Sequence, residues 1–338
     1  MKFLIIRFSS IGDIVLTTPV IRCIKKQLPD VEIHFLVKPF FKSTLVNNPY
    51  ITKLHLLQED LDKTVLDLKH EQFDFVIDLQ RNLNSFRIKK SLKIPAFSFK
   101  KLNFQKLLFT KLKWNIMPKH DHVVDRYLKT VEPFGVHNDG GGLDYFIAPG
   151  EEVNEKDIPT SHHAGYIGIV IGASFYTKKL PVDKLQELCS KIDHPIILLG
   201  DKDDATNGEE IKKLDSVKIY NACGKFSLNE SADLIRRAKL IIAHDTGLMH
   251  IASALRKQVI GIWGSTTPSM GMYPYFGTNF LSQQVTHPHD EIQVHKLWCR
   301  PCTEMGRTKC PQGHFKCMRN MPIDEILLKL NVRLGRSY

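Results

Sequence analysis

The stretch "KFLIIRFSSIGDIVLTTPVIRCIKKQL", Lys2 to Leu28, begins as an apolar run and ends with apolar residues at helical spacing. The change falls at Ile11, Gly12 and Asp13, so we expect a buried strand, a tight junction and then a helix. Gly12 permits the close approach of another chain or of a ligand. A strand that leads into a helix in this way predicts a parallel βαβ unit.

The same alternation of an apolar, strand-like run and a helical stretch recurs along the chain. Apolar runs with the character of buried strands are "VEIHFLV", "KLHLLQ" and "FDFVIDL" in the first half, and "GYIGIVIG", "HPIILLG", "VKIYNA", "KLIIAHD" and "QVIGIWG" in the second. Helical stretches between them predict two α/β domains with doubly wound parallel sheets, whose carboxyl edges face each other across a cleft.

The boundary between the two domains is expected in a region rich in Gly, Pro and acids. We place the linker near residues 150–163 and the domains at 1–155 and 156–338. We expect the last helix, about residues 322–338, to pack back on the first domain.

Composition narrows the class of protein. The chain has 338 residues, of which 43% are hydrophobic and 25% charged, as expected for two folded domains rather than a disordered chain. Arg7 and Asp13 interrupt the first apolar run, which argues against a signal peptide, and no apolar segment reaches the roughly 18 residues of a membrane span. We therefore expect a cytoplasmic protein whose membrane contact is peripheral.

The charge of the chain is unevenly distributed. The net charge is +11, and residues 81–120 contain eleven Lys and Arg but no Asp or Glu. Apolar side chains alternate with these charges, which suits an anionic membrane surface. Nucleic acid would fit the charge equally well, and a solvated basic face is the ordinary alternative. The residues that we assign to an anionic acceptor or membrane are Arg81, Arg87, Lys89, Lys90, Lys100 and Lys101.

Asp13 stands where ligands bind in sheets of this kind, at a strand-to-helix junction. One interpretation is a carboxylate that complements the positive end of a helix. The other is a general base in the cleft. Position alone leaves both open.

In the second half, "HDTGLMHIASAL" places a helix start directly after a strand. The free N–H groups of a helix start suit a pyrophosphate, and Gly247 removes the side chain that would block it. We therefore assign Asp245, Thr246, Gly247 and His250 to a donor site, although a lone histidine is more often structural.

Three further loops follow strands. Ser174, Thr177 and Lys178 in "GASFYTKKLP" suit phosphate oxygens, whereas Lys179 reads as a surface lysine. Asp204 in "GDKDD" is a candidate ribose contact or, with its neighbours, a cation ligand. Phe226 is a candidate wall of a base pocket, next to a capping box formed by Ser227 and Glu230.

Neither of two common nucleotide-binding fingerprints is present. No G-x-G-x-x-G follows a strand and no G-x-x-x-x-G-K-[ST] occurs. Because its glycine fingerprint is missing, a nicotinamide oxidoreductase ranks low among the alternatives.

Four of the seven cysteines cluster near the end of the chain, at Cys299, Cys302, Cys310 and Cys317. One C-x-x-C with two further cysteines fits a structural zinc. Free thiols are the alternative, and a disulfide is disfavoured in a reducing compartment.

Together, "FSSIGDIVLTTP", "GAS...TKKLP", "HDTGLMHIASAL" and "GIWGSTTP" resemble the bacterial heptosyltransferases of glycosyltransferase family 9. The resemblance spans nearly the whole chain, and it implies a GT-B fold with an acceptor-binding first domain and a nucleotide-sugar-binding second domain. Typical members transfer L-glycero-D-manno-heptose from its ADP donor to the lipopolysaccharide inner core, with inversion and without a metal. Better-known members have Lys-x-Trp-Pro where this chain has Lys178-Lys179-Leu180-Pro181.

The resemblance also implies roles for individual residues. Asp13 matches the family's catalytic base and Lys178 its phosphate-binding lysine. Thr246 and Gly247 match the pyrophosphate seat, with Asp245 near the donor sugar and His250 near the phosphates. The implied partners are ADP-heptose, an anionic lipopolysaccharide core and the inner face of the inner membrane.

Two alternatives remain at this point. One keeps the fold but changes the sugar or the acceptor. The other is a basic, zinc-containing nucleic-acid-binding protein, which would leave Asp13, Lys178 and the Asp-Thr-Gly junction unexplained. We expect no nucleic-acid partner and no cofactor for catalysis.

Overall fold

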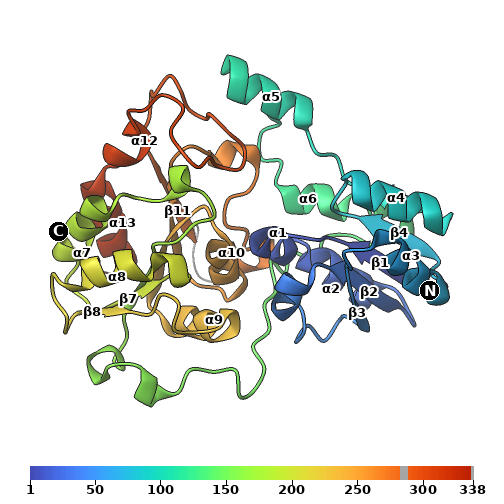
Figure 1. The fold of residues 1–338 in the computed structure, drawn as a ribbon, viewed down its shortest axis with the longest axis horizontal. Helices are drawn as coiled ribbons and strands as arrows, with labels where there is room; N and C mark the ends of the chain where they lie inside the picture. Colours follow the sequence, from blue (N-terminus) through green and yellow to red (C-terminus); the bar gives the residue numbers. More distant parts are fainter. Residues whose placement is uncertain (282–287, 336–338) are drawn as a thin grey trace.

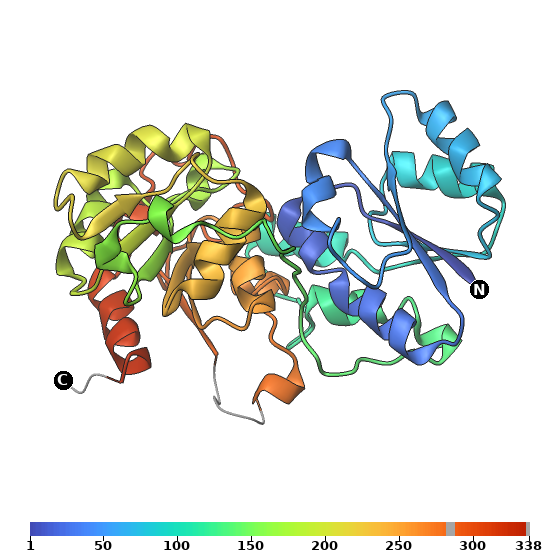
Figure 2. The same cartoon turned by 90° about the horizontal axis from the view of Figure 1, so that it is seen from below.

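The computed structural model describes residues 1–281 and 288–335, which form two α/β domains side by side (Figures 1 and 2). The first sheet has the order β3-β2-β1-β4-β5 and all of its strands are parallel. Its strands are β1 (Lys2–Ile6), β2 (Glu32–Val37), β3 (Lys53–Leu56), β4 (Phe75–Asp78) and β5 (Ala96–Ser98). The chain thus reverses its winding direction between β1 and β4.

The second sheet repeats this arrangement with one more strand. Its order is β11-β10-β9-β6-β7-β8, again all parallel. The strands are β6 (Ile167–Val170), β7 (Ile196–Leu199), β8 (Ile219–Asn221), β9 (Leu240–His244), β10 (Val259–Trp263) and β11 (His289–Gln293). Here the winding reverses between β6 and β9. The prediction of two doubly wound parallel sheets is confirmed.

Helices cover both faces of each sheet because the strands are apolar on both sides. The helices of the first domain are α1 (Ile11–Val15), α2 (Thr18–Gln27), α3 (Leu61–His70), α4 (Leu83–Leu92), α5 (Asn103–Leu112), which projects from the body of the domain (Figure 1), and α6 (Val123–Leu128). In the second domain they are α7 (Val182–Lys191), α8 (Ala205–Lys212), α9 (Leu228–Arg237), α10 (Gly247–Ala254), α11 (Thr278–Leu281), α12 (Lys316–Arg319) and α13 (Ile323–Arg333). Short 3-10 helices that matter below are η5 (Tyr176–Lys178), η6 (Lys202–Asp204) and η7 (Pro268–Met270).

One hydrophobic cluster runs through both domains. It contains Phe3 and Ile21 of the first domain together with Ile241, Met249 and Trp263 of the second, all buried. Separate clusters fill the α3 and α4 side of the first sheet and the α7 and α13 side of the second. The two domains therefore share part of their core.

The connection between the sheets belongs to both domains. Near its start, Arg22 of α2 pairs with Asp139 at 2.7 Å. Farther on, the hydroxyl of Tyr145 donates to Asn229 on α9 at 2.5 Å. The N–H of Val153 donates to the buried Asp233 of the same helix at 3.0 Å. The predicted boundary at 155/156 lies within this segment.

The C-terminal helix packs differently from the prediction. α13 lies against α7, β10 and β11 of the second domain (Figure 1). Ile323, Ile326 and Leu330 are buried in the core of that domain, and Arg333 pairs with Asp290 of β11 at 2.5 Å. The expectation that this helix returns to the first domain was wrong, because its apolar face completes the outer layer of the second sheet.

Among the described residues, no helix is long and apolar enough to cross a membrane.

Candidate functional site

The candidate site lies where the carboxyl edges of the two sheets meet. Asp13 follows β1, Ser174 and Lys178 follow β6, and Asp245 follows β9. These strands flank the two points at which the winding reverses, and such points open a crevice for ligands in doubly wound sheets. Residues that are far apart in sequence are thereby brought to one place.

Helices α1 and α10 touch across the domain boundary, near the centre of Figure 1. A Cβ on Gly247 would lie 2.8 Å from the Cβ of Ile11 and 3.2 Å from the nitrogen of Gly12. A Cβ on Gly12 would lie 2.7 Å from Cδ2 of His250. The two glycines therefore let the helices meet backbone to backbone, and no side chain would fit between them.

Arg7 holds Asp13 in place. The Arg7 guanidinium lies 2.7 Å from Oδ1 of Asp13. The same guanidinium donates to the carbonyl oxygens of Ser9 at 2.8 Å and Leu79 at 2.6 Å, and to the hydroxyl of Tyr127 at 3.2 Å. The Asp13 side chain keeps 23% of its surface exposed. The carboxylate is thus fixed in direction and still open to the cleft.

Asp13 is also the third residue of α1 and closes a capping box with Ser10. The hydroxyl of Ser10 donates to Oδ2 of Asp13 at 2.9 Å. Burial alone would raise the pKa of Asp13, but the Arg7 charge and the Ser10 hydrogen bonds outweigh it and lower that pKa. The two interpretations of Asp13 are therefore compatible, because the carboxylate caps the helix and faces the cleft while ionised.

Lys178 and Asp245 form the opposite wall. Nζ of Lys178 lies 2.8 Å from Oδ2 of Asp245, and the hydroxyl of Thr266 donates to the same oxygen at 2.9 Å. Both charged side chains are largely buried, with 13% and 11% of their surface exposed. The lysine charge is thereby held at the strand ends beside α10.

Two buried polar atoms at the start of α10 lack partners. Within the described part of the chain, Oγ1 of Thr246 and Nδ1 of His250 accept or donate no hydrogen bond. Buried polar atoms are normally satisfied. Burial lowers the pKa of His250 to about 4, so its imidazole is neutral at pH 7. Together with the free N–H groups of a helix start, these atoms are suited to a ligand at this point.

Comparison with known proteins identifies the family. The family model described as Glycosyltransferase family 9 (heptosyltransferase) matches residues 63–307, more than half of the chain. The chain belongs to this family. The glycosyltransferase is 29% identical to lipopolysaccharide heptosyltransferase 1 of Campylobacter coli over 293 residues, which cover 79% of this chain and 84% of that protein.

Solved structures agree with this assignment. The ADP-heptose lipopolysaccharide heptosyltransferase II of E. coli superposes with a TM-score of 0.72 at 19% identity, covering 99% of this chain and 98% of that one. A family 9 glycosyltransferase from Veillonella parvula gives 0.76 at 18% identity, covering 99% and 97%. At such identities the likeness shows the fold, and the GT-B prediction is confirmed.

Two predicted donor residues of the glycosyltransferase, Thr177 and Asp204, have structural contacts, and their donor roles remain predictions. The buried hydroxyl oxygen of Thr177 accepts hydrogen bonds from the N–H of Arg307 at 2.8 Å and from the hydroxyl of Ser265 at 2.9 Å. The carboxylate of Asp204 is buried and pairs with Lys179 at 2.6 Å. Asp204 also accepts from the N–H of Asp201 at 3.2 Å. The interpretation of Lys179 as a surface lysine was wrong, because it neutralises this buried acid.

Ser174 and Phe226 lie in loops at the same edge of the second sheet. Ser174 is exposed after β6, and Phe226 is half-buried just before α9. The capping box of Ser227 and Glu230 is confirmed by hydrogen bonds of 2.7 and 3.3 Å. Ser174 and Phe226 remain predictions as donor contacts.

Sequence reasoning assigned no role to two side chains in the site, Arg7 and Thr266. Arg7 was visible as a charge inside an apolar strand, and Thr266 stands in the motif "GIWGSTTP". Arg7 also contacts Leu79 and Tyr127, and Thr266 contacts Asp245, all of them distant in sequence, so these contacts emerge only from the fold.

The basic stretch forms α4, β5 and α5 and the segment after them. Some of its charges are already paired, since Lys89 lies 2.6 Å from the buried Asp78 and Lys106 lies 3.0 Å from Glu304 of the other domain. Burial, together with the nearby Arg7 charge, lowers the pKa of Lys101. Lys101 is half-buried, whereas Arg81, Arg87, Lys90 and Lys100 are exposed.

The four clustered cysteines are free thiols. Within the described residues, no three of their sulfurs come within 4.8 Å of one another. Sγ of Cys299 lies 3.8 Å from Nε2 of His314, and Sγ of Cys302 lies 3.9 Å from the Ser265 carbonyl oxygen. The loop as described does not present an assembled tetrahedral ligand set.

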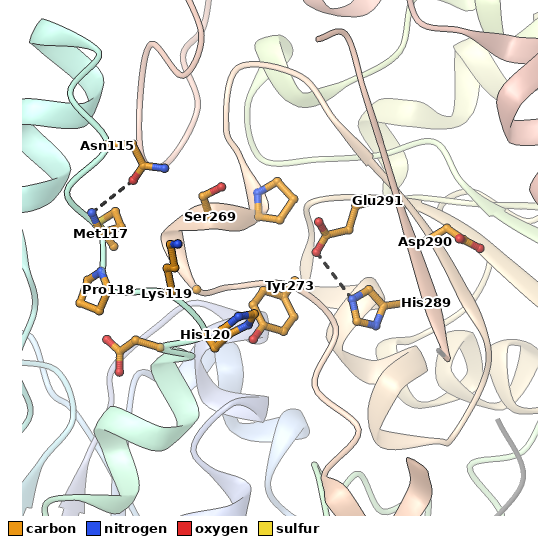
Figure 3. A pocket seen from close by; sticks show the side chains of 13 residues that line it. Asn115, Met117, Pro118, Lys119, His120, Ser269, Tyr273, His289, Asp290 and Glu291 are labelled. Atoms are coloured by element: carbon orange, nitrogen blue, oxygen red, sulfur yellow. Dashed lines mark hydrogen bonds and ion pairs between the residues drawn. The ribbon is translucent and has the colours of Figure 1, made fainter. Parts of the chain in front are cut away.

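A pocket of about 720 Å³ opens between the two domains, and its lining does not include the candidate base or donor residues (Figure 3). It is lined by Asn115 and residues 117–121, by the turn around η7 with Tyr273, and by the first three residues of β11. Lys119 and His120 lie on one side, and Glu291, paired with His289 at 3.6 Å, lies on the other. No residue assigned to the base or to the donor lines this pocket, so we give it no part in the reaction.

Proposed function

We propose that the protein transfers L-glycero-D-manno-heptose from its ADP donor to the inner core of lipopolysaccharide, with inversion. The main support is the apposition of Asp13 on one domain with Lys178 and the start of α10 on the other. The names of the relatives support the choice of sugar and acceptor. One solved structure of similar fold is an E. coli heptosyltransferase with ADP-2-deoxy-2-fluoro heptose.

The chemistry follows from this arrangement. The acceptor hydroxyl attacks the anomeric carbon, its proton passes to Asp13, and the bond from that carbon to the donor phosphate oxygen breaks. Negative charge develops on the departing ADP, where Lys178 and the N–H groups at the start of α10 would stabilise it. A single displacement of this kind inverts the anomeric configuration.

The first experiment is donor binding. Calorimetry on the metal-stripped protein should show tight binding of ADP-heptose and ADP, and weak binding of GDP and UDP. A preference for another nucleotide would keep the glycosyltransferase but change the sugar donor. Failure of all four to bind would remove the support for this site as a donor site.

Asp13→Asn tests the base. We expect kcat to fall by about 100-fold or more, the usual contribution of a general base, while calorimetry shows unchanged binding of ADP. Asp62→Asn, an exposed carboxylate on α3, is the matched control. Full turnover in Asp13→Asn would refute the assignment.

We further propose that α5 and the residues after it contact the inner face of the inner membrane. Phe104, Leu107, Leu112 and Trp114 are exposed there, between 53% and 65%. Lysines alternate with them, and in Figure 1 α5 projects from the body of the first domain. Exposed apolar groups among cations fit an anionic bilayer surface.

Vesicle sedimentation tests this surface. Vesicles that contain anionic lipid should retain the protein, and Phe104→Ser with Leu107→Ser should weaken that binding several-fold. Leu66→Ser, at an exposed leucine on α3, is the control. Equal binding to neutral and anionic vesicles would contradict the proposal.

For catalysis we propose no cofactor, and activity should survive exhaustive chelation. A structural zinc at Cys299, Cys302, Cys310 and Cys317 stays a prediction of the sequence, because these sulfurs are not gathered into a ligand set. Zinc content of the purified protein, compared with that of Cys302→Ser, tests it.

A further inference from the structure

A second group of ligating side chains lies in the first domain, away from the cleft. His34 of β2, His55 of β3 and Glu71 at the end of α3 bring their ligand atoms within 4.8 Å of one another. Their side chains are 3%, 10% and 18% exposed. Glu71 follows α3 and contacts Lys2, the first residue of β1, so the group extends to the amino ends of the sheet, opposite to the catalytic edge.

The distances suit a tetrahedral metal ion. Nδ1 of His34 lies 2.9 Å from Nε2 of His55. Oxygens of Glu71 lie 3.7 Å from that nitrogen of His34 and 3.9 Å from that of His55. Ligands at ~2.1 Å from a tetrahedral zinc stand about 3.4 Å apart. The three observed separations bracket this value, so small side-chain shifts would complete the geometry.

The surroundings of His34 match those of a metal ligand. Its other ring nitrogen, Nε2, lies 3.6 Å from a carboxylate oxygen of Glu32. Ligating histidines commonly direct their second nitrogen to a carboxylate, which fixes the tautomer. The ring of Phe73 packs edge-on against both imidazoles, with centroids 5.1 and 6.0 Å away. An apolar wall and a carboxylate partner thus orient the pair.

Binding requires a tautomer change in one of the two imidazoles, besides the small side-chain shifts. In the hydrogen-bonded pair, one of the two facing nitrogens carries a proton, and that proton must move to the outer nitrogen of its own ring. Burial lowers the pKa of both imidazoles, that of His55 to about 4.

Two lysines compete for the same carboxylate. Lys53 pairs with Glu71, and Nζ of Lys2 lies 3.8 Å from it. Lys53 is more than half exposed and can turn into solvent. Its ammonium and a bound cation would exclude each other, which makes Lys53 a test of the site.

We propose that His34, His55 and Glu71 bind a divalent zinc ion, with water at the fourth position. The ion would tie the short edge strand β3 to β2 and to the end of α3. Because an edge strand is paired on one side only, its main effect would be on the stability of the first domain.

The test uses zinc chloride and the full-length, metal-stripped, reduced protein. Calorimetry should show one equivalent of zinc that is lost, or bound at least about tenfold more weakly, in His55→Gln and in Glu71→Gln. His70→Gln, an exposed neighbour on the same helix, is the matched control. Any zinc on the cysteines is a constant background in all of these variants.

A variant that binds zinc more tightly is a useful second test, because misfolding can explain a loss of zinc binding but not a gain. Lys53→Met should tighten the binding of this equivalent several-fold, and zinc should raise the melting temperature of the wild type but not of Glu71→Gln. ADP binding should be the same in every variant, because the cleft lies at the other edge of the sheet. Equal zinc stoichiometry and affinity in the wild type, Glu71→Gln and Lys53→Met would overturn the proposal.

Discussion

At the scale of single residues, Arg7 determines how Asp13 behaves. The Arg7 side chain is 10% exposed, and its guanidinium contacts Ser9, Leu79, Tyr127 and the Asp13 carboxylate. Buried charges of this kind need a partner. The pair therefore gives Asp13 a fixed direction and keeps it ionised at neutral pH.

Arg7→Gln should reduce turnover and move its pH dependence. Without the positive charge, the pKa of Asp13 rises, so the acidic limb of the kcat profile should shift to higher pH. We expect kcat at pH 7 to fall by about tenfold or more, with ADP binding unchanged by calorimetry. Lys63→Gln on α3 serves as the control for loss of a charge. An unmoved acidic limb would show that Arg7 does not set the ionisation of Asp13.

The sequence predicted which strand-to-helix junctions form the candidate site, but it did not predict the side-chain contacts between those junctions. Asp13, Lys178 and Asp245 were found because strand ends and helix starts are visible as patterns. The pairing of Lys179 with Asp204 was missed, because two loops that are adjacent in space follow different strands. Local pattern predicts a residue's place on an element, whereas its partner depends on the packing of the whole sheet.

At the scale of elements, the contact of α1 with α10 joins the two halves of the site. Both helices begin at the carboxyl edges of their sheets, and glycine on each side removes the atoms that would keep them apart. Gly247 was expected to make room for a pyrophosphate, and in the structure it also makes room for Ile11. One small residue thus serves both the domain contact and the proposed ligand seat.

Gly247→Ala should separate these helices. The added Cβ would overlap both Cβ and Cγ2 of Ile11, each 2.8 Å away, and such overpacking costs ~1–3 kcal/mol. We expect a lower urea midpoint and a loss of kcat. Adding Ile11→Ala removes Cγ2 and should restore part of the stability in a double-mutant cycle. Strict additivity of the two substitutions would argue against a direct clash.

Two strands escaped sequence reasoning, and both are edge strands. β5 has three residues within the basic stretch, and β11 reads "HDEIQ", which is mostly polar. Strands buried on both faces have continuous apolar runs, whereas short or polar edge strands lack that signal. The other nine strands, which include the edge strands β3 and β8, have apolar runs in the sequence and were predicted for that reason.

At the scale of the whole molecule, the shared hydrophobic cluster couples the domains. Three buried histidines lie in or beside this interface, namely His122, His244 and His250. Burial lowers their pKa values to about 3, 4 and 4. These imidazoles stay neutral in the folded protein at pH values where the unfolded chain would protonate them.

Acid should therefore destabilise the protein well above the pKa values of its carboxylates. Between pH ~6.5 and ~4 the unfolded chain binds more protons at these histidines than the folded one, so the free energy of unfolding falls as the pH falls. Urea unfolding at pH 7, 6 and 5 should show a decreasing midpoint, and the two domains should unfold in one transition. A midpoint that does not change with pH would contradict the role of the histidines, and two separate transitions would contradict the coupling of the domains.

The near contact of Gly12 and Gly247 also bears on how the enzyme moves. This contact lies beside Asp13 and the start of α10, so any rotation of one domain about it has its fulcrum next to the reacting atoms. Points near a fulcrum barely move, whereas the distant rim sweeps through a long arc. Opening would then widen the mouth of the cleft and stretch the Lys106–Glu304 pair, while the gap between base and leaving group keeps nearly the same width.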